Sequence, residues 1–211
     1  MSTAPIQVDF FYGIGSRYSY LASTQIAALE RDTGCRVNWR PLFSGKLIAM
    51  TGTNPFAGKS VSTQYLRGYR EKDAARWAAY LGVPYLEPPA EFIHDPAVPN
   101  KLALACTAAA LMGDAAAMSR RLFSMVFAEP GPDASDESLA MRAQEAGYDR
   151  SAFLDALNGP ETAAALEATT REAHDRGAFG VPTFFIGDEL FWGNDRLVLV
   201  RDCLTAGSHD M

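Results

Sequence analysis

The sequence predicts an α/β fold in which an all-helical domain is inserted into a small sheet. The chain opens with an apolar strand, a helix and a second strand, and it closes with a helix, two short strands and a last helix. A long Ala-rich stretch with helical spacing separates these two ends. Because strands alternate with helices only at the ends, we assign residues 1–44 and 171–211 to the sheet domain and residues 45–170 to the inserted helical domain.

The N-terminal end predicts a β-α-β unit. Residues 6–12 gather apolar side chains as a buried strand does, and residues 16–33 have a helical spacing that Gly34 ends. Residues 36–42 form the second predicted strand. Strands joined through a helix pair in parallel with a right-handed crossover, so we expect these two strands to be parallel neighbours.

Helices fill the middle of the chain. A turn at residues 52–55 opens this part, and several prolines mark an irregular connector between its first two helices. Asp133, Ser135 and Ser151 are predicted N-caps, because their side-chain oxygens can accept from the free N–H groups of a first helical turn. The predicted helices span residues 64–81, 100–112, 115–127, 135–146, 151–157 and 161–177.

The C-terminal end completes the predicted sheet. Residues 183–186 and 189–192 are short apolar strands that meet at Gly187 and Asp188, which predicts a hairpin. A last helix is expected over residues 195–204. The whole order of elements is that of a thioredoxin-like fold with a helical domain in its middle.

Composition argues against several classes of function. A net charge of −6 without a basic run disfavours nucleic-acid binding. No apolar stretch reaches membrane-spanning length, and the first residues lack the pattern of a signal peptide. We therefore expect a cytoplasmic protein that does not bind membranes.

The spacing of cysteine and histidine predicts neither a redox motif nor a metal site. Cys35, Cys106 and Cys203 are widely separated, and none forms a Cys-x-x-Cys, which argues against a disulfide framework. The three histidines lack metal-ligand spacing with each other or with cysteine. We expect buried or incidental thiols and no bound metal.

Ser16 is the first candidate catalytic residue. It follows Gly15 at the predicted start of the first helix, where thioredoxin-like folds keep a Cys-x-x-Cys. One interpretation is that Ser16 only caps its helix. The other is that its hydroxyl, at a helix start that favours negative charge, donates to a thiolate brought by a cofactor. No Gly-x-Ser-x-Gly motif surrounds Ser16, so a triad-type nucleophile is disfavoured.

Two C-terminal segments are candidate cofactor-binding groups. Val181-Pro182 precedes a strand, where the proline either enters the strand or forms a cis bond. A cis bond would turn the backbone N–H and C=O of Val181 toward a bound peptide, of which glutathione is one. Asn194 and Asp195 come just before the last helix, either as N-caps or with Asp195 accepting from the ammonium of a γ-glutamyl group. Both roles can hold together.

Other polar residues are weaker candidates. Asn54 lies in a predicted turn, where asparagine is common for structural reasons alone. Lys46, Lys59, Arg67 and Arg70 are either solvated surface residues or a source of positive charge near a carboxylate substrate. Four aromatic residues at helical spacing are expected in the core: Trp77, Phe92, Phe123 and Phe127.

Taken together, the chain resembles the 2-hydroxychromene-2-carboxylate isomerase family, which is similar to kappa-class glutathione transferases and to DsbA-like oxidoreductases. The resemblance covers nearly the whole chain. The segments that carry it are residues 9–12 with 16–21, residues 76–78 with 81–84, and residues 179–184 with 191–197.

The resemblance implies a glutathione-dependent isomerase of aromatic compound degradation, acting as a homodimer on a small aromatic 2-oxo acid. In that family the serine that matches Ser16 is catalytic and stabilises the glutathione thiolate. The positions that match Asn54, Val181, Asn194 and Asp195 would hold the tripeptide, with Pro182 beside them.

This sequence departs from the family at the residue after Ser16. Members usually have proline where this chain has Arg17, which adds positive charge beside the expected thiolate. We therefore count Arg17, with Lys46 and Lys59, among the residues expected to bind substrate. The segment between the first strand and Ser16 also lacks the family's usual acidic residue.

The residues by themselves leave two alternatives open and disfavour a third. A kappa-type glutathione transferase would use the same binding residues to conjugate electrophiles. A thioredoxin-like protein that binds glutathione or a peptide without catalysis would also fit. A dithiol oxidoreductase is disfavoured, because no cysteine occupies the helix start.

Overall fold

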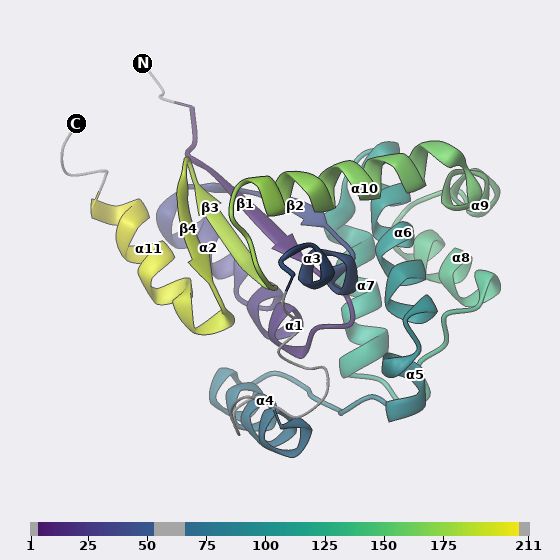
Figure 1. Cartoon of the computed structure of the whole chain (residues 1–211), viewed down its shortest axis with the longest axis horizontal. Coiled ribbons are helices and arrows are strands. Elements are labelled where there is room, and N and C mark those ends of the chain that lie inside the picture. Colours follow the sequence, from purple (N-terminus) through teal and green to yellow (C-terminus); the bar gives the residue numbers. More distant parts are fainter. Residues whose placement is uncertain (1–3, 53–65, 207–211) are drawn as a thin grey trace.

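The computed structural model describes residues 4–52 and 66–206, and it contains one four-stranded mixed sheet in the order β2-β1-β3-β4 (Figure 1). β1 (Gln7–Tyr12) pairs in parallel with β2 (Arg36–Pro41) and antiparallel with β3 (Thr183–Ile186). β3 forms a hairpin with β4 (Glu189–Trp192). The predicted β-α-β unit and the predicted C-terminal hairpin are both confirmed.

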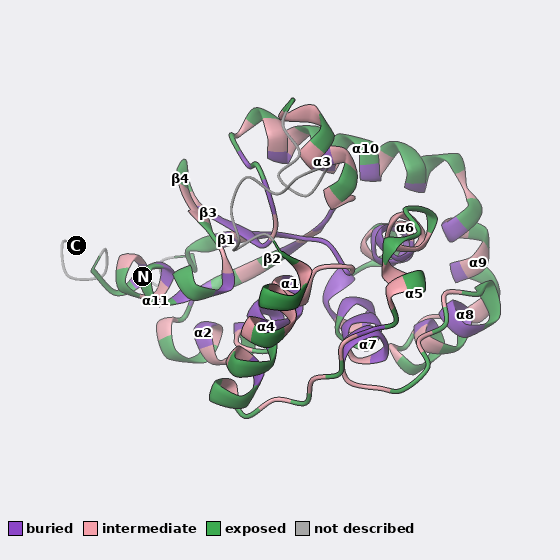
Figure 2. Ribbon diagram, turned by 60° about the horizontal axis from the view of Figure 1, so that its bottom comes forward, coloured by how far each residue is buried: buried purple, intermediate pink, exposed green. Residues whose placement is uncertain are grey.

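β1 is a central strand that is covered on both faces. Phe10, Phe11 and Tyr12 are fully buried, and successive side chains point to opposite faces of a strand. The ring of Phe10 stacks on Phe184 at 4.9 Å, whereas Phe11 meets Phe185 edge-on at 5.7 Å on the other face. Figure 2 shows this strand buried between the layers of helices. A run of apolar residues without alternation is typical of a strand packed on both sides.

The predicted first helix is two helices. α1 (Arg17–Ser23) ends before α2 (Ile26–Thr33) begins. The hydroxyls of Ser23 and Thr24 donate to backbone carbonyls of the preceding turn, at 2.6 and 2.7 Å. Such side-chain bonds compete with helix propagation, which is the physical reason for the break. Gly34 ends α2 in the left-handed conformation, as predicted.

The middle of the chain is helical, as predicted, with two helices that the sequence did not predict. α3 follows Phe43, which offers no capping oxygen, and α5 has five residues between prolines, so local patterns mark neither. The helices are α3 (Ser44–Met50), α4 (Arg67–Leu81), α5 (Ala90–His94), α6 (Ala97–Met112), α7 (Ala115–Phe127), α8 (Asp136–Glu145), α9 (Arg150–Asn158) and α10 (Pro160–Asp175).

One of the three predicted N-caps is confirmed. The hydroxyl of Ser135 accepts from the N–H of Ser138 and caps α8. Asp133 is not a cap, because its carboxylate accepts from Ser135 instead. Ser151 is not a cap either: α9 begins one residue earlier, since Asp149 accepts from the N–H three residues on.

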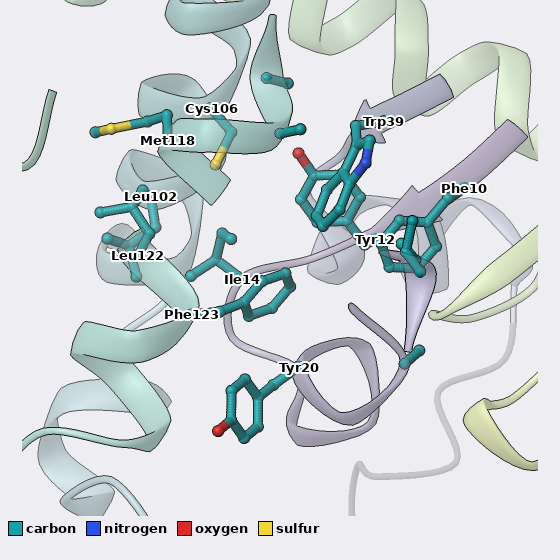
Figure 3. Close-up of a cluster of buried hydrophobic side chains, with 14 of the residues drawn as sticks. Phe10, Tyr12, Ile14, Tyr20, Trp39, Leu102, Cys106, Met118, Leu122 and Phe123 are labelled. Carbon is teal, nitrogen blue, oxygen red and sulfur yellow. The ribbon is translucent and has the colours of Figure 1, made fainter. Parts of the chain in front are cut away.

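The sheet and the helical block share one core. Phe10 and Tyr12 of β1 belong to the same buried cluster as Leu102 of α6 and Phe123 of α7 (Figure 3). Helices α6, α7 and α10 also contact β2 directly. The expected domain boundary between residues 170 and 171 falls inside α10, and the division into domains stays a prediction.

The C-terminal segment begins with a tighter turn than predicted. A 3-10 turn, η2 (Asn194–Arg196), leads into α11 (Leu197–Ala206). Gly193 occupies the N-cap position of η2, so the predicted capping by Asn194 or Asp195 is wrong. Within the residues that the structure describes, no helix has the length and apolar character needed to span a membrane.

Candidate active site

Ser16 is the N-cap of α1, in extended backbone conformation with φ −99° and ψ 115°. Its Oγ accepts from the backbone N–H of Ser19 at 3.2 Å. The predicted capping role is therefore confirmed. Because the bond uses an oxygen lone pair, the hydroxyl proton of Ser16 remains able to donate to another group.

Packing on two sides positions the loop that carries Ser16. A Cβ added to Gly13 would lie 3.2 Å from Oγ of Ser44, at the start of α3. A Cβ added to Gly15 would lie 3.2 Å from Cβ of Pro99 in α6. The two glycines thus allow the helical block to approach the end of β1 closely, which holds the start of α1 in place.

The cis-proline loop lies beside the same end of β1. The Val181–Pro182 bond is cis, which the sequence left open. Thr183, the first residue of β3, pairs with Phe11 near the C-terminal end of β1. Pro182 therefore lies beside the end of β1 from which the chain continues to Ser16. The carbonyl of Pro182 accepts from the N–H of Gly193 at 2.9 Å, which ties this loop to the end of β4.

Asn194 and Asp195 reach the site through η2, which contacts α1. Asn194 is only 5% exposed, and its side-chain Nδ2 is buried without an acceptor among the described residues. The carboxylate of Asp195 pairs with Arg196. The structure therefore brings Ser16, the Val181–Pro182 loop and the η2 turn to one end of the sheet. Their roles in binding stay predictions.

Two of the three cations expected to bind substrate, Arg17 and Lys46, are engaged in ion pairs. Arg17 pairs with Glu87, with its Nε 3.3 Å from Oε2, and its side chain is only 11% exposed. Burial by itself would lower the pKa of Arg17, but hydrogen bonding and attraction to Glu87 raise it above its ordinary value. Lys46 pairs with Glu167 at the surface. Asn54 and Lys59 lie outside the described residues.

Sequence reasoning missed Glu87 and its neighbour Tyr85, whose hydroxyl donates to the same carboxylate. Glu87 lies in the proline-rich connector that follows α4. Glu87 is 70 residues from Arg17 in sequence. The only sequence signal was an unpaired charge among prolines, and that signal does not identify a partner.

No thiol of the chain belongs to this site. Cys35 and Cys106 are buried and Cys203 is partly buried, and all three are free. Burial raises the pKa of Cys106 to about 12, so this thiol stays protonated at neutral pH. Over residues 4–52 and 66–206, no three His, Cys, Asp or Glu side chains cluster in a way that could hold a metal ion.

A cavity of about 330 Å³ lies elsewhere, where the edge strand β2 faces α6, α7 and α10. Its lining includes Trp39, Arg40, Thr107 and Asp114. None of the residues predicted to form the site lines it, and it plays no part in the function proposed below.

The chain matches known proteins over nearly its whole length. The model of the DSBA-like thioredoxin domain matches residues 7–205. A 2-hydroxychromene-2-carboxylate isomerase of Pseudomonas putida is 30% identical over 199 residues, which cover 93% of each chain. The isomerase of the same name from Sphingobium xenophagum is 28% identical over 93% of this chain and 97% of its own.

A solved structure extends the similarity to three dimensions. The structure of a 2-hydroxychromene-2-carboxylate isomerase matches with a TM-score of 0.83 at 26% identity and covers 97% of both chains. A match of this length includes both the sheet and the helical insertion. This chain therefore belongs to the DSBA-like thioredoxin family, and it is similar to 2-hydroxychromene-2-carboxylate isomerases over more than nine-tenths of its length.

Proposed function

We propose that this protein is a glutathione-dependent isomerase that acts on a conjugated aromatic 2-oxo acid. Its relatives are named as isomerases of 2-hydroxychromene-2-carboxylate, which supports the reaction type. The observation that carries the proposal is the hydroxyl of Ser16. It occupies the helix start in place of a thiol, its oxygen is held by the N–H of Ser19, and its proton is left to donate.

The described residues fit a small peptide thiol. The buried Nδ2 of Asn194 lacks an acceptor among them, and a carboxylate or carbonyl of a bound peptide would supply one. The Val181–Pro182 loop offers backbone groups beside Ser16, and Asp195 offers a carboxylate to an ammonium group. Gly193, with φ +113°, keeps this turn free of a side chain that would collide with Asp195.

Glutathione, when bound, supplies the nucleophilic sulfur that adds reversibly to a conjugated double bond, so that rotation can occur about a single bond. The task of the protein is to favour the ionised form of that sulfur. A free thiol has a pKa of about 8.5, and lowering it by about two units requires about 2.7 kcal/mol. One hydrogen bond to a charged acceptor contributes about 1.5–3 kcal/mol. Donation by Ser16 therefore supplies more than half of this free energy, and the start of the seven-residue α1 adds about 0.3–1 kcal/mol.

The direct test is turnover of a 2-hydroxychromene-2-carboxylate substrate with and without glutathione. We expect isomerisation to depend on glutathione and to leave its concentration unchanged, because the thiol is released in each cycle. Turnover at the same rate without glutathione would contradict the proposal.

The same assay separates the alternatives. Steady consumption of glutathione with an electrophilic substrate would identify a kappa-type transferase, which would use the same binding residues. Glutathione binding without either reaction would identify a binding protein. The homodimer and the cytoplasmic location stay predictions.

A further inference from the structure

Glu87 neutralises a cation that lies one residue from Ser16. Arg17 occupies the first position of α1, where a positive charge is unfavourable next to the free N–H groups of the first turn. The Arg17 guanidinium is mostly buried and pairs with Glu87 through two nitrogens. A buried cation at this position requires a partner, and Glu87 supplies it from the connector that follows α4.

The connector that holds Glu87 is itself fixed against α1 and α7. The hydroxyl of Tyr20 in α1 donates to the carbonyl of Pro84, and the N–H of Leu86 donates to the carbonyl of Phe127 at 2.6 Å. The ring of Tyr85 stacks on Tyr20 at 6.4 Å. Glu87 is thus a positioned charge and not a mobile surface carboxylate.

The charges around this pair come from α1, α4 and the helix after the connector. Arg67 of α4 lies 4.0 Å from Glu87 and also approaches His94, while the hydroxyl of Tyr18 donates to Asp73 at 2.8 Å.

The same surroundings shift the pKa values of nearby groups. Tyr85 donates to Glu87, and its pKa is raised, first by burial and then by this bond. Burial, followed by the charge of Arg17, lowers the pKa of Arg70, and Arg67 itself pairs with Glu71. Figure 1 shows α4 and its connector beside α1.

We propose that Glu87 is a positioning residue of the Ser16 site, which holds and neutralises the Arg17 guanidinium and so sets how much positive charge a thiolate at Ser16 experiences. The inference rests on the proposed function, because a thiolate is expected at that position. Beyond the proposed function, the inference assigns to Arg17 and Glu87 a part in setting how much of the thiol at Ser16 is ionised. Neither residue needs to contact the sulfur for this effect.

Geometry bounds the size of the effect. Neighbouring Cα atoms are about 3.8 Å apart, an arginine side chain extends about 7 Å and its hydrogen bond spans about 3 Å, so the Glu87 carboxylate lies within roughly 14 Å of the Cα of Ser16. Two charges at that separation, partly screened by solvent and salt, shift a pKa by a few tenths of a unit to about one unit.

A thiol placed at Ser16 measures this charge without glutathione. In the Ser16→Cys protein, the pKa of the introduced thiol is read from thiolate absorbance and from the pH dependence of alkylation. The protein with Ser16 intact gives the background of the three native thiols. Glu87→Gln, Arg17→Gln and the double variant are then added to the Ser16→Cys protein.

We expect Glu87→Gln to lower the pKa of the introduced thiol by a few tenths of a unit to about one unit, because Arg17 is left uncompensated. Arg17→Gln is expected to raise it, because Glu87 then keeps only the more distant Arg67 as an ion-pair partner among the described residues, and Arg67 also pairs with Glu71. Arg17→Lys is expected to keep the original value. The double variant should return close to that value. Glu137→Gln, which removes the partner of Arg150 between α8 and α9, makes the same change in net charge away from α1 and should leave the pKa unchanged.

Shifts in the same direction for Glu87→Gln and Arg17→Gln would show that the pair only holds the connector, and would overturn the proposal. No shift in either folded variant would overturn it as well. If Glu87→Gln does not fold, Arg17→Gln and Arg17→Lys test the same charge with the opposite sign. Because the measurement needs no glutathione, its failure is distinct from a failure of the proposed function.

Discussion

At the residue scale, Ser16 combines a structural and a chemical role in one hydroxyl. Its oxygen accepts from Ser19 and its proton can donate, so capping and thiolate stabilisation are compatible. The sequence predicted both roles from the position of Ser16 after Gly15. It did not predict that Arg17, the next residue, is held by Glu87.

The two roles of Ser16 can be separated by substitution. Ser16→Ala is expected to lower the glutathione-dependent rate by about ten- to a hundredfold, since one hydrogen bond to a charged acceptor is lost. It is also expected to destabilise the protein by about 1 kcal/mol through loss of the cap. Steady-state kinetics at saturating glutathione and urea unfolding measure the two effects.

Ser16→Asp is the matched control for capping. Aspartate caps helices as well as serine, so stability should be close to that of the parent protein, yet it cannot donate and repels a thiolate. We expect Ser16→Asp to be folded and inactive. Activity near that of the parent protein in either variant would show that Ser16 is only a cap.

At the element scale, the turn between β4 and α11 holds the candidate binding groups. Gly193 has φ +113°, and an added Cβ would collide with Oδ1 of Asp195. Asn194 follows it, buried, with its Nδ2 lacking an acceptor among the described residues. The sequence predicted the two strands here to the residue but not the 3-10 turn, whose geometry depends on contact with α1.

Gly193→Ala tests whether the shape of this turn matters for binding. We expect a loss of stability larger than the ~1 kcal/mol typical of alanine in a left-handed position, and weaker glutathione binding by calorimetry. Gly187→Ala is the control, because Gly187 has φ +57° in the adjacent hairpin and an added Cβ meets nothing within 4 Å. Gly187→Ala should lower the free energy of unfolding only by the ~1 kcal/mol that alanine costs in a left-handed position. Equal effects of the two substitutions on binding would contradict a role for the turn.

At the scale of the whole molecule, the sheet and the helical block form one packed unit. The hydroxyl of Tyr12 in β1 is hydrogen-bonded to Ser119 of α7 inside the shared core. Phe123 of α7 packs against Tyr12 with ring centroids 5.7 Å apart. Alternating strands and helices predicted both parts, and the shared core now joins them, while the division into two domains stays a prediction.

This shared core predicts a single unfolding transition. Helical circular dichroism and tryptophan fluorescence, which includes the buried Trp39, should change together in urea. Phe123→Ala is expected to cost about 3–5 kcal/mol and to shift both probes equally. Val198→Ala, at a side chain that is 66% exposed, should stay within about 0.5 kcal/mol. Two separate transitions would show that the inserted helices form an independent domain.

The sequence alone determined the strand order along the chain, most of the helices, the buried first strand, the cap at Ser16 and the C-terminal hairpin. These features depend on residues close together in the chain, whose spacing and turn chemistry are visible in one dimension. Only the tertiary structure decided the cis bond at Pro182, the burial of Asn194 and the pairing of Arg17 with Glu87. Each of these depends on groups that folding brings together from distant parts of the chain, as Glu87 meets Arg17 across 70 residues. The physical reason is that spacing along the chain does not show which distant groups a packed core places in contact.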